Sequence, residues 1–354
     1  MQARGRGAAR PPVGVAFEGD LGHRIDALLV PAILNGLVAK GDARSIALCI
    51  SRPSLRTAQL ADVVARFYGG SGRGGGAAMV GMPEGPLPAN DSPPLAAVLS
   101  KPATEGNAPY SSSIRSVIDT ADNAVVIRNI LLAQHDGNAV VVLAGPASGL
   151  ARMLDLYGAR PQIAAKVRLL VVAAGSFPSG PADSAIASDV AAARALFADW
   201  PTPVVAVGSE VGAALPFPGA SLAQDMEWAP HHPIVDAYRL FKPMPYDAPA
   251  SALAAVLHAV HPDADHFKLS EPGTITVRDD GRTEFTPVAE GRHRYLIVDP
   301  AQKARLTALY TELVTAEPAR RPARGGPPPA QQQQQQQQKP APPPNPPTAK
   351  PSVP

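Results

Sequence analysis

The chain has 354 residues, with 32 Lys and Arg against 30 Asp and Glu, 41 prolines and a single cysteine. This length allows one large domain or two ordinary ones, and a hydrophobic content of 45% excludes wholesale disorder. The lone Cys49 excludes an internal disulfide framework and a cysteine-based zinc site. No run of about 18 apolar residues exists, so no membrane span is expected.

The formal net charge of +2 is the sum of two unlike parts. All 30 acidic residues lie between Glu18 and Glu317, whereas three arginines precede this range and five basic residues follow it. Removing these eight from the 32 basic residues leaves 24 against 30, so the body carries a balance of −6. An acidic body does not have the charge of a nucleic-acid binder, and no nucleic-acid partner is expected.

Both ends of the chain are predicted to be disordered. Residues 1–12 are basic but are followed by no apolar segment, so the sequence as written predicts a cytoplasmic protein. A true start farther upstream would instead allow an extracytoplasmic location. Residues 318–354 contain 13 prolines and an unbroken glutamine run at 331–338. With few large apolar side chains, this tail cannot offset its ordering entropy by burial. It is a candidate for binding a protein partner, and one alternative treats it as the functional part of the chain.

Between these ends, residues 13–317 alternate strand-like and helix-like patterns. In chain order they predict a strand at 13–17, a helix at 25–39, a strand at 45–50, a helix at 57–68, a looser Gly/Pro-rich stretch at 69–109, a helix at 114–134, a strand at 139–144, a helix at 148–157, a strand at 167–173, a helix at 189–199, a strand at 202–208, strands at 274–277 and 294–298, and a helix near 300–315.

This alternation predicts the fold class. Continuous apolar strands separated by helices are typical of an α/β fold with an open, mostly parallel sheet and helices on both faces. The strands after residue 262 add a small β-rich C-terminal part. Ligands of such folds sit at the carboxyl ends of the strands.

The first predicted strand ends in F-E-G-D-L-G-H-R-I-D at 17–26. Glu18, Asp20 and Asp26 fall within nine residues at this strand-to-helix turn. Carboxylates that converge at such a turn suit Ca²⁺ or Mg²⁺, which prefer oxygen ligands. The alternative is a helix N-terminus that favours acidic residues as caps and for its dipole. The spacing alone leaves both interpretations open.

Several motifs together resemble the inosine/uridine-preferring nucleoside hydrolases, in particular a bacterial branch with a lengthened D-T-D-x-G-x-D-x-D-D-A-L motif. The likeness covers about 14–315 in collinear order. It rests on 17–29, on A-V-V-V-L-A-G-P-A-S-G-L-A (139–151), on 169–194, on D-W-P-T-P-V-V-A-V-G-S-E-V-G (199–212), on P-I-V-D-A-Y (233–238) and on Y-D-A-P-A-S-A-L-A-A-V-L-H-A-V (246–260).

The resemblance implies an N-ribohydrolase that cleaves the N-ribosidic bond of a purine or pyrimidine nucleoside. In that family Ca²⁺ holds the ribose hydroxyls and a water, and an aspartate deprotonates the water, a step that the metal makes easier. Asp20 matches the base and a metal ligand, and Asp26 matches a carboxylate that binds metal and ribose. The carbonyl of Ala144 and the side chain of Asp247 match the other two metal ligands.

The resemblance alone suggests a homo-oligomer.

Two further positions are expected to contact the substrate. Asp183 lies at the acidic position of the family's E-x-N motif, and Tyr246 lies near the late motif, where it could stack on the base.

The chain also departs from the family pattern. Glu18 stands at the opening aspartate, Arg24 replaces an aspartate, and Ala27 reduces the paired D-D. Ala185 and Gly149 replace two asparagines. A cation at residue 24 would oppose metal binding if its side chain pointed inward. The sequence therefore supports two hypotheses: a Ca²⁺-assisted nucleoside hydrolase, or a catalytically degenerate relative that binds a nucleoside, a sugar or a protein.

Overall fold

The computed structural model describes residues 11–69, 78–102 and 110–318. The tail predicted to be disordered lies outside these ranges except for Pro318, and so do the first ten residues and most of the glycine-rich stretch after residue 69. No helix within the described ranges is long and apolar enough to cross a membrane.

Within the described ranges, eleven strands form one sheet, with ten of them in the order β10-β9-β11-β7-β6-β5-β1-β2-β3-β4 and β8 paired with β11. The strands are β1 (Val13–Gly19), β2 (Ala43–Ile50), β3 (Met79–Met82), β4 (Ala121–Asp122), β5 (Ala139–Ala144), β6 (Val167–Val172), β7 (Val204–Ala206), β8 (Lys268–Leu269), β9 (Gly273–Val277), β10 (Thr283–Pro287) and β11 (His293–Ile297).

The helices of the described ranges lie mostly between the strands along the chain. They are α1 (Ile25–Leu28), α2 (Val30–Lys40), α3 (Leu55–Gly69), α4 (Asn123–Leu132), α5 (Ser148–Asp155), α6 (Ala159–Lys166), α7 (Ser184–Ala187), α8 (Val190–Asp199), α9 (Ser209–Ala214), α10 (Gly219–Gln224), α11 (Pro233–Phe241), α12 (Ser251–Val260) and α13 (Lys303–Val314), with the short 3-10 helices η1 (Pro94–Ser100), η2 (Val117–Asp119) and η3 (Pro300–Gln302).

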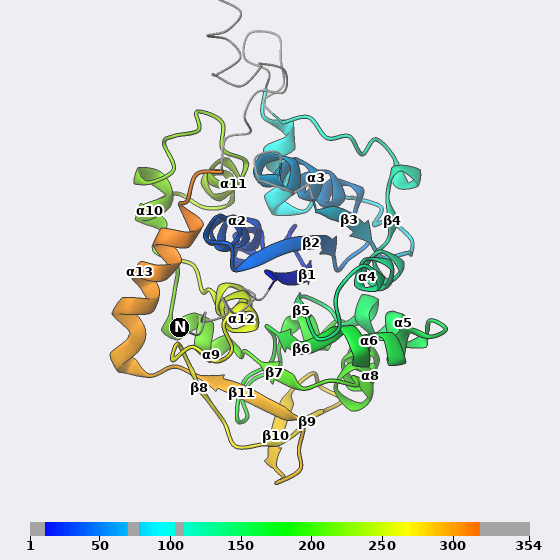
Figure 1. Ribbon diagram of the computed structural model, residues 1–354. Coiled ribbons are helices and arrows are strands. Elements are labelled where there is room, and N and C mark those ends of the chain that lie inside the picture. Colours follow the sequence, from blue (N-terminus) through cyan, green and yellow to red (C-terminus); the bar gives the residue numbers. More distant parts are fainter. Residues whose placement is uncertain (1–10, 70–77, 103–109, 319–354) are drawn as a thin grey trace, which may run out of the picture. The chain divides into compact units, whose positions relative to one another are not determined.

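The predicted parallel sheet with helices on both faces is confirmed. Figure 1 shows α2, α12 and α13 on one face and α4, α6 and α8 on the other. The side chains of β1 alternate accordingly: Val15 and Phe17 belong to the core under the first face, and Ala16 belongs to the core under the second. Every residue of α12 is buried because this helix lies against β5, β6 and α2.

The order of the strands places a switch point beside β1. The chain extends from β1 through β2 and β3 on one side, and from β5 through β6 and β7 on the other. β1 pairs in parallel with both β2 and β5. In doubly wound sheets the crevice at such a reversal, at the carboxyl ends of the strands, is where ligands bind.

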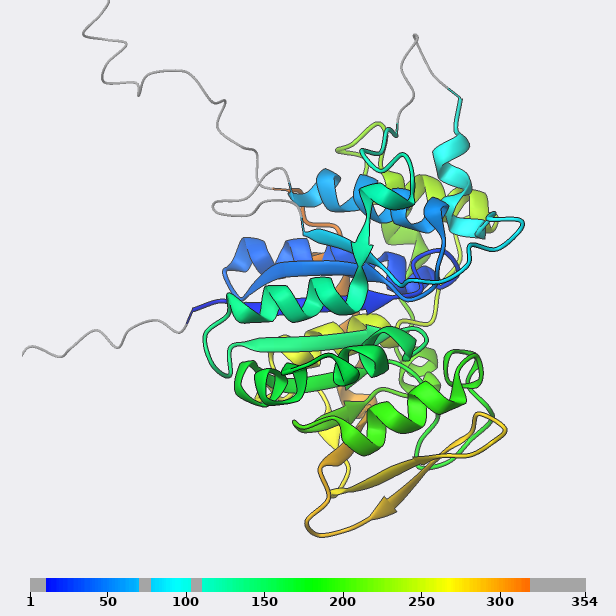
Figure 2. The same ribbon diagram turned by 90° about the vertical axis from the view of Figure 1, so that its right-hand side faces the viewer.

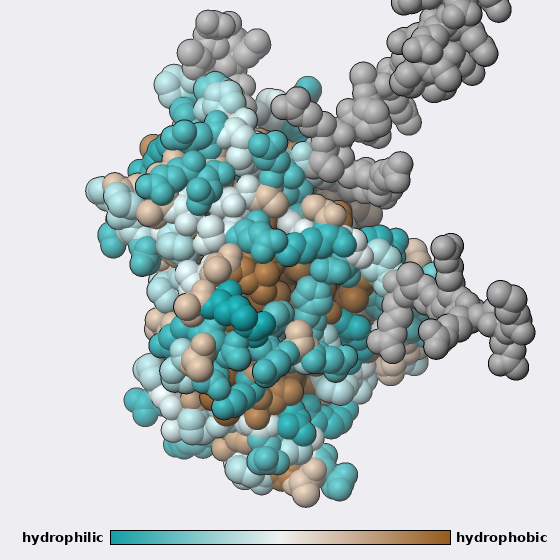
Figure 3. Space-filling model, turned by 60° about the vertical axis from the view of Figure 1, so that its left-hand side comes forward, coloured by the Kyte–Doolittle hydropathy of each residue, from teal (hydrophilic) through white to brown (hydrophobic). Residues whose placement is uncertain are grey.

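The β-rich C-terminal part does not form a sheet of its own. β11 pairs in parallel with β7, and β9 and β10 form an antiparallel hairpin beside it, seen at the bottom of Figure 2. On the face that carries α13, apolar surface is broken up by polar side chains (Figure 3).

Several predicted elements have different bounds in the structure. The helix predicted at 25–39 is two helices, because Pro31 has no N–H to continue the hydrogen-bond ladder of α1. The helix predicted at 114–134 begins only at Asn123, where the Asp122 carboxylate accepts the Val125 N–H as an N-cap. The stretch predicted as loose at 69–109 contains β3 and η1.

Candidate functional site

Asp20 lies at the switch point of the sheet. It follows Gly19, the last residue of β1, which pairs with Ile50 of β2 and Ala144 of β5. The Asp20 N–H donates to the Ala144 carbonyl at 3.0 Å. The two positions that the resemblance assigns to the base and to a backbone ligand are therefore in contact. The prediction that ligands meet the carboxyl ends of the strands leads to this point of the sheet.

Both carboxylate oxygens of Asp20 already accept hydrogen bonds from side chains. His23 Nδ1 donates to Oδ1 at 2.8 Å, and Arg52 Nε donates to Oδ2 at 2.7 Å. Burial opposes ionisation of Asp20, but the hydrogen bonds from His23 and Arg52 outweigh it and hold its pKa below the ordinary value. Asp20 is thus ionised and a weak base.

Asp26 forms a bidentate ion pair with Arg24. Nε of Arg24 donates to Oδ1 at 3.1 Å and Nη2 to Oδ2 at 2.8 Å. The same Oδ2 accepts the Ser251 hydroxyl at 3.1 Å and the Ala252 N–H at 3.0 Å, both at the start of α12. Burial would raise the pKa of Asp26, but Arg24 and these donors bring it below the ordinary value.

The Arg24 guanidinium is fixed on the protein side. In addition to Asp26, it donates from Nη1 to the Ala173 carbonyl at 2.7 Å and from Nη2 to the Ser251 hydroxyl at 3.0 Å. Burial would lower its pKa, but Asp26, followed by Asp183 and Asp20, raises it. Arg24 is therefore a permanent cation that joins the ends of β1 and β6 to α12.

The residues present do not fit the calcium ion that the family resemblance implies. The oxygens of Asp20 and Asp26 accept from arginines, and the Asp247 carboxylate is exposed and accepts the Gly219 N–H at 3.1 Å. Within the described ranges, no three His, Cys, Asp or Glu side chains come together as metal ligands would. A guanidinium bonded to Asp26 also repels a second cation there. The structure therefore does not bring together Asp20, Asp26, Ala144 and Asp247 as one metal site.

Asp183 and Tyr246, the two residues predicted to contact the substrate, have different surroundings from each other. Asp183 caps α7, accepting the N–H groups of Ala185 and Ile186 through Oδ1, and its charge acts on Arg24. Tyr246 donates its hydroxyl to the Tyr238 carbonyl at 3.1 Å. Its ring stacks on the Tyr238 ring, and burial raises the pKa of its phenol to about 12. No hydrogen bond, ion pair or ring contact within the described ranges joins Tyr246 to Arg24 or Asp20.

Sequence reasoning missed three residues of this site: His23, Arg52 and Ser251. Arg52 directly follows a serine at the end of β2, and a polar residue in that position was the available signal. His23 lies inside the motif at 17–26, in which only the carboxylates predicted a ligand site. Ser251 carried no such signal, because only the packing of α12 against the β1 loop brings it to Asp26.

Glu18, the opening residue of the motif, lies apart from this network. Its side chain is fully buried, and neither carboxylate oxygen has a hydrogen-bond partner within the described ranges. Burial, together with the nearby Asp122, raises its pKa well above the ordinary value despite an opposing effect of Arg152. Glu18 therefore contributes no negative charge to the exposed side of the site.

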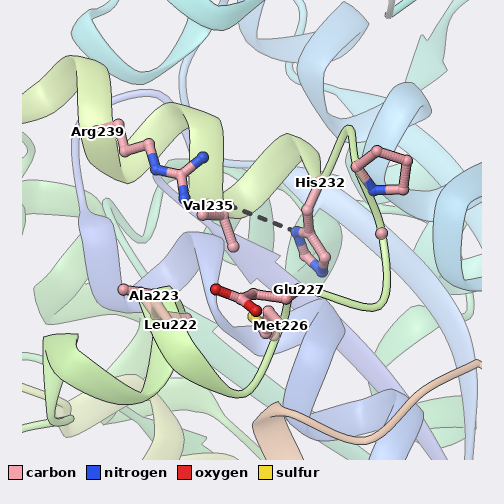
Figure 4. A pocket seen from close by; sticks show the side chains of 9 residues that line it. Leu222, Ala223, Met226, Glu227, His232, Val235 and Arg239 are labelled. Atoms are coloured by element: carbon pink, nitrogen blue, oxygen red, sulfur yellow. Dashed lines mark hydrogen bonds between the residues drawn. The ribbon is translucent and has the colours of Figure 1, made fainter.

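A separate small cavity of about 170 Å³ lies beside α10 and α11. Figure 4 shows His232 and Arg239 on its wall, with Leu222 and Met226 opposite. His232 is buried, accepts the Val235 N–H at Nδ1 and contacts the Tyr68 hydroxyl at 3.0 Å through Nε2. These contacts explain His232 as a helix cap.

Solved structures share the architecture. A plant nucleoside hydrolase, the PpNRh1 enzyme, superposes with a TM-score of 0.63 at 20% identity, over 86% of this chain and 100% of that one. The fold is that of the nucleoside hydrolases.

Two further solved structures are similar to this chain, with comparable TM-scores and sequence identities. The inosine-uridine preferring nucleoside hydrolase from Bacillus anthracis gives a TM-score of 0.62 at 16% identity, over 86% of this chain and 99% of that one. The type III effector protein XopQ, complexed with adenosine diphosphate ribose, gives 0.62 at 15% identity, over 88% and 95%. No protein-family model and no curated protein matches the chain by sequence.

Proposed function

We propose that this chain is a nucleoside hydrolase-fold protein that binds a ribosyl ligand without calcium and does not hydrolyse it. The observation that carries the proposal is the bidentate pair between Arg24 and Asp26. It supplies a fixed cation, held by the Ala173 carbonyl and Ser251, beside a carboxylate that the family resemblance assigns to a metal ion. The comparison with XopQ supports this direction, because that structure holds a ribosyl compound in the same fold.

Acid–base chemistry supports binding rather than hydrolysis. Water that is not bound to a metal has a pKa near 15.7, so its deprotonation needs a strong, unencumbered base. Asp20 has a lowered pKa, and both of its oxygens accept hydrogen bonds from His23 and Arg52. Such a carboxylate is poorly matched to general-base catalysis near neutral pH, where an effective base has a pKa close to the working pH.

The same groups are suited to holding a sugar. One carboxylate oxygen of Asp183 caps α7, and the other has no hydrogen-bond partner within the described ranges, so it can accept from a ribose hydroxyl. Arg24 Nη1 donates one hydrogen bond to Ala173 and has a second N–H to offer. Asp183 lies near enough to Arg24 for its charge to raise the pKa of the guanidinium, so a donor and an acceptor are available to ribose hydroxyls in this site.

The competing proposal is a Ca²⁺-dependent N-ribohydrolase. It is favoured by one observation, the contact between the Asp20 backbone and the Ala144 carbonyl at the switch point. In that function Asp20 would be the base, and Asp26, Ala144 and Asp247 would complete the ligand set.

Calorimetry of the full chain separates the two proposals. We expect ribose or adenosine to bind equally well in EDTA and in calcium, calcium alone to give no binding heat, and no reducing sugar to appear from purine and pyrimidine nucleosides. Asp183→Asn, which keeps the Oδ1 that caps α7 but removes the charge, is expected to weaken ribosyl binding, with the exposed Asp155→Asn on α5 as the control. Calcium binding together with sugar release that Asp20→Ala abolishes would overturn the binding proposal in favour of the hydrolase.

A further inference from the structure

The outward side of the candidate site presents hydrogen-bond donors. Arg52 is 38% exposed and uses only Nε, on Asp20, so its two Nη groups have no partner within the described ranges. His23 is 47% exposed and uses only Nδ1, again on Asp20. The acceptors behind them are covered, since the side chains of Asp20 and Asp26 are each only 7% exposed.

Because the donors are exposed and the acceptors are covered, the exposed side of the site can recognise a ligand group that accepts hydrogen bonds. A guanidinium with two free Nη groups offers a planar fork that matches two oxygens of a phosphate. The His23 ring lies on the other oxygen of the Asp20 carboxylate that Arg52 contacts. Asp20 fixes the Arg52 side chain from behind through Nε, so less rotamer entropy is lost when Arg52 binds an anion.

Ser51, the residue before Arg52, is a second and independent observation. Its side chain is 3% exposed in all, and its Oγ has no hydrogen-bond partner within the described ranges. The hydroxyl lies against Gly145, where an added Cβ would come within 2.2 Å of Oγ and 3.0 Å of the Asp20 nitrogen. A buried hydroxyl without a partner is costly, and this cost falls on the residue next to Arg52 in the loop that follows β2.

We propose that the ligand of this site is a phosphorylated ribose, with its phosphate bound by Arg52 and its hydroxyls directed to Asp183 and Arg24. This inference rests on the proposed ribosyl-binding function and adds the anionic group. Phosphate is favoured over an uncharged substituent because the exposed Nη groups of Arg52 are donors and the carboxylate behind them is already paired.

The test is isothermal calorimetry of the full chain in EDTA with ribose, ribose 5-phosphate, adenosine, adenosine 5′-monophosphate and inorganic phosphate. We expect each phosphorylated compound to bind about ten- to a hundredfold tighter than its unphosphorylated counterpart, the range of a charge-assisted hydrogen bond. Arg52→Gln should remove most of this difference. Arg52→Lys, which keeps the charge but not the fork, should recover part of it.

Arg160→Gln is the matched control, because Arg160 forms a surface pair with Asp199 and has no contact with the site. Equal affinity for ribose and ribose 5-phosphate would overturn the phosphate inference while leaving ribosyl binding intact. A phosphate preference that survives Arg52→Gln would overturn the assignment to Arg52. Absence of binding by all five compounds would overturn both this inference and the proposed function.

Discussion

The carboxylate of Glu18 occupies the space that a side chain at residue 149 would need. A Cβ built on Gly149 would lie 2.4 Å from Oε1 and 2.8 Å from Oε2 of Glu18, and 2.2 Å from Nδ2 of Asn123. The family motifs that the sequence resembles have the shorter aspartate at the first position and an asparagine at the second. The two departures therefore compensate each other sterically.

Restoring only one of these two residues should be costly. Gly149→Asn is expected to lower the free energy of unfolding by about 1–3 kcal/mol, because the new side chain overpacks against Glu18 and Asn123. The double variant Glu18→Asp with Gly149→Asn should lose less than the sum of the two single variants, by about 1 kcal/mol. Urea denaturation of the four proteins of this cycle measures the coupling.

A control for the helix position is Ser148→Asn, which adds an amide one residue earlier in α5. Ser148 donates to Asp189 and has no hydrogen bond to Glu18, so no coupling with Glu18→Asp is expected. Strict additivity of Glu18→Asp and Gly149→Asn would show that the two residues were lost independently.

Much of the fold could be predicted because buried strands leave a strong local pattern. The run at 139–144 matches β5 residue for residue, and that strand lies between two others and is covered on both faces. β4 has only two residues, Ala121 and Asp122, and no period can be read from so short an element. The early start predicted for α4 failed because Asp122 caps the helix, which apolar spacing does not reveal.

The site was predictable only where its residues follow a strand. Asp20 could be located from the end of β1 alone. The fate of Arg24 depends on the Ala173 carbonyl, 149 residues away, and on Ser251, 227 residues away. The local sequence pattern does not reveal partners so far along the chain. The sequence therefore could not predict whether the Arg24 side chain points inward.

Replacing Arg24 should convert the site into one that responds to calcium. Arg24→Asp, the residue that the resemblance places there, is expected to cost about 3–5 kcal/mol in EDTA, because Asp26 loses its cation in a buried position. The carboxylates near Ala144 should then bind calcium and recover stability by mass action. Thermal unfolding in EDTA and in calcium measures the difference.

The wild type and the surface variant Arg160→Asp should have the same melting temperature in both buffers. A rise in the melting temperature of the wild type with calcium would contradict the exclusion of the ion by Arg24. No response of Arg24→Asp would mean that something other than the guanidinium excludes it.

Ser251 rather than Asp247 should be the residue of the late motif that matters for the site. Ser251→Ala removes a hydroxyl that contacts both Asp26 and Arg24, and we expect a loss of about 1–3 kcal/mol in unfolding free energy and weaker ribosyl binding. Asp247→Ala should cost only about 1 kcal/mol, through the Gly219 N–H, and leave ribosyl affinity unchanged. Denaturation measures the unfolding free energy of the two variants, and calorimetry measures their ribosyl affinity. Weaker ribosyl binding by Asp247→Ala would show that Asp247 belongs to the site.

The stability of the chain should fall in mild acid through His232. Burial lowers the pKa of this imidazole from 6.5 to about 4. As the pH falls below 6.5, the unfolded chain therefore binds a proton that the folded chain does not, and the stabilisation is lost between pH 6.5 and about 4. One such group contributes about 2–3 kcal/mol across this window.

His232→Asn keeps an acceptor for the Val235 N–H but does not titrate. This variant should be less stable at pH 7, because it loses the contact with Tyr68. On acidification its free energy of unfolding should fall by about 2–3 kcal/mol less than that of the wild type. The exposed His135→Asn should follow the wild type, and parallel curves for all three proteins would show that His232 does not control the acid response.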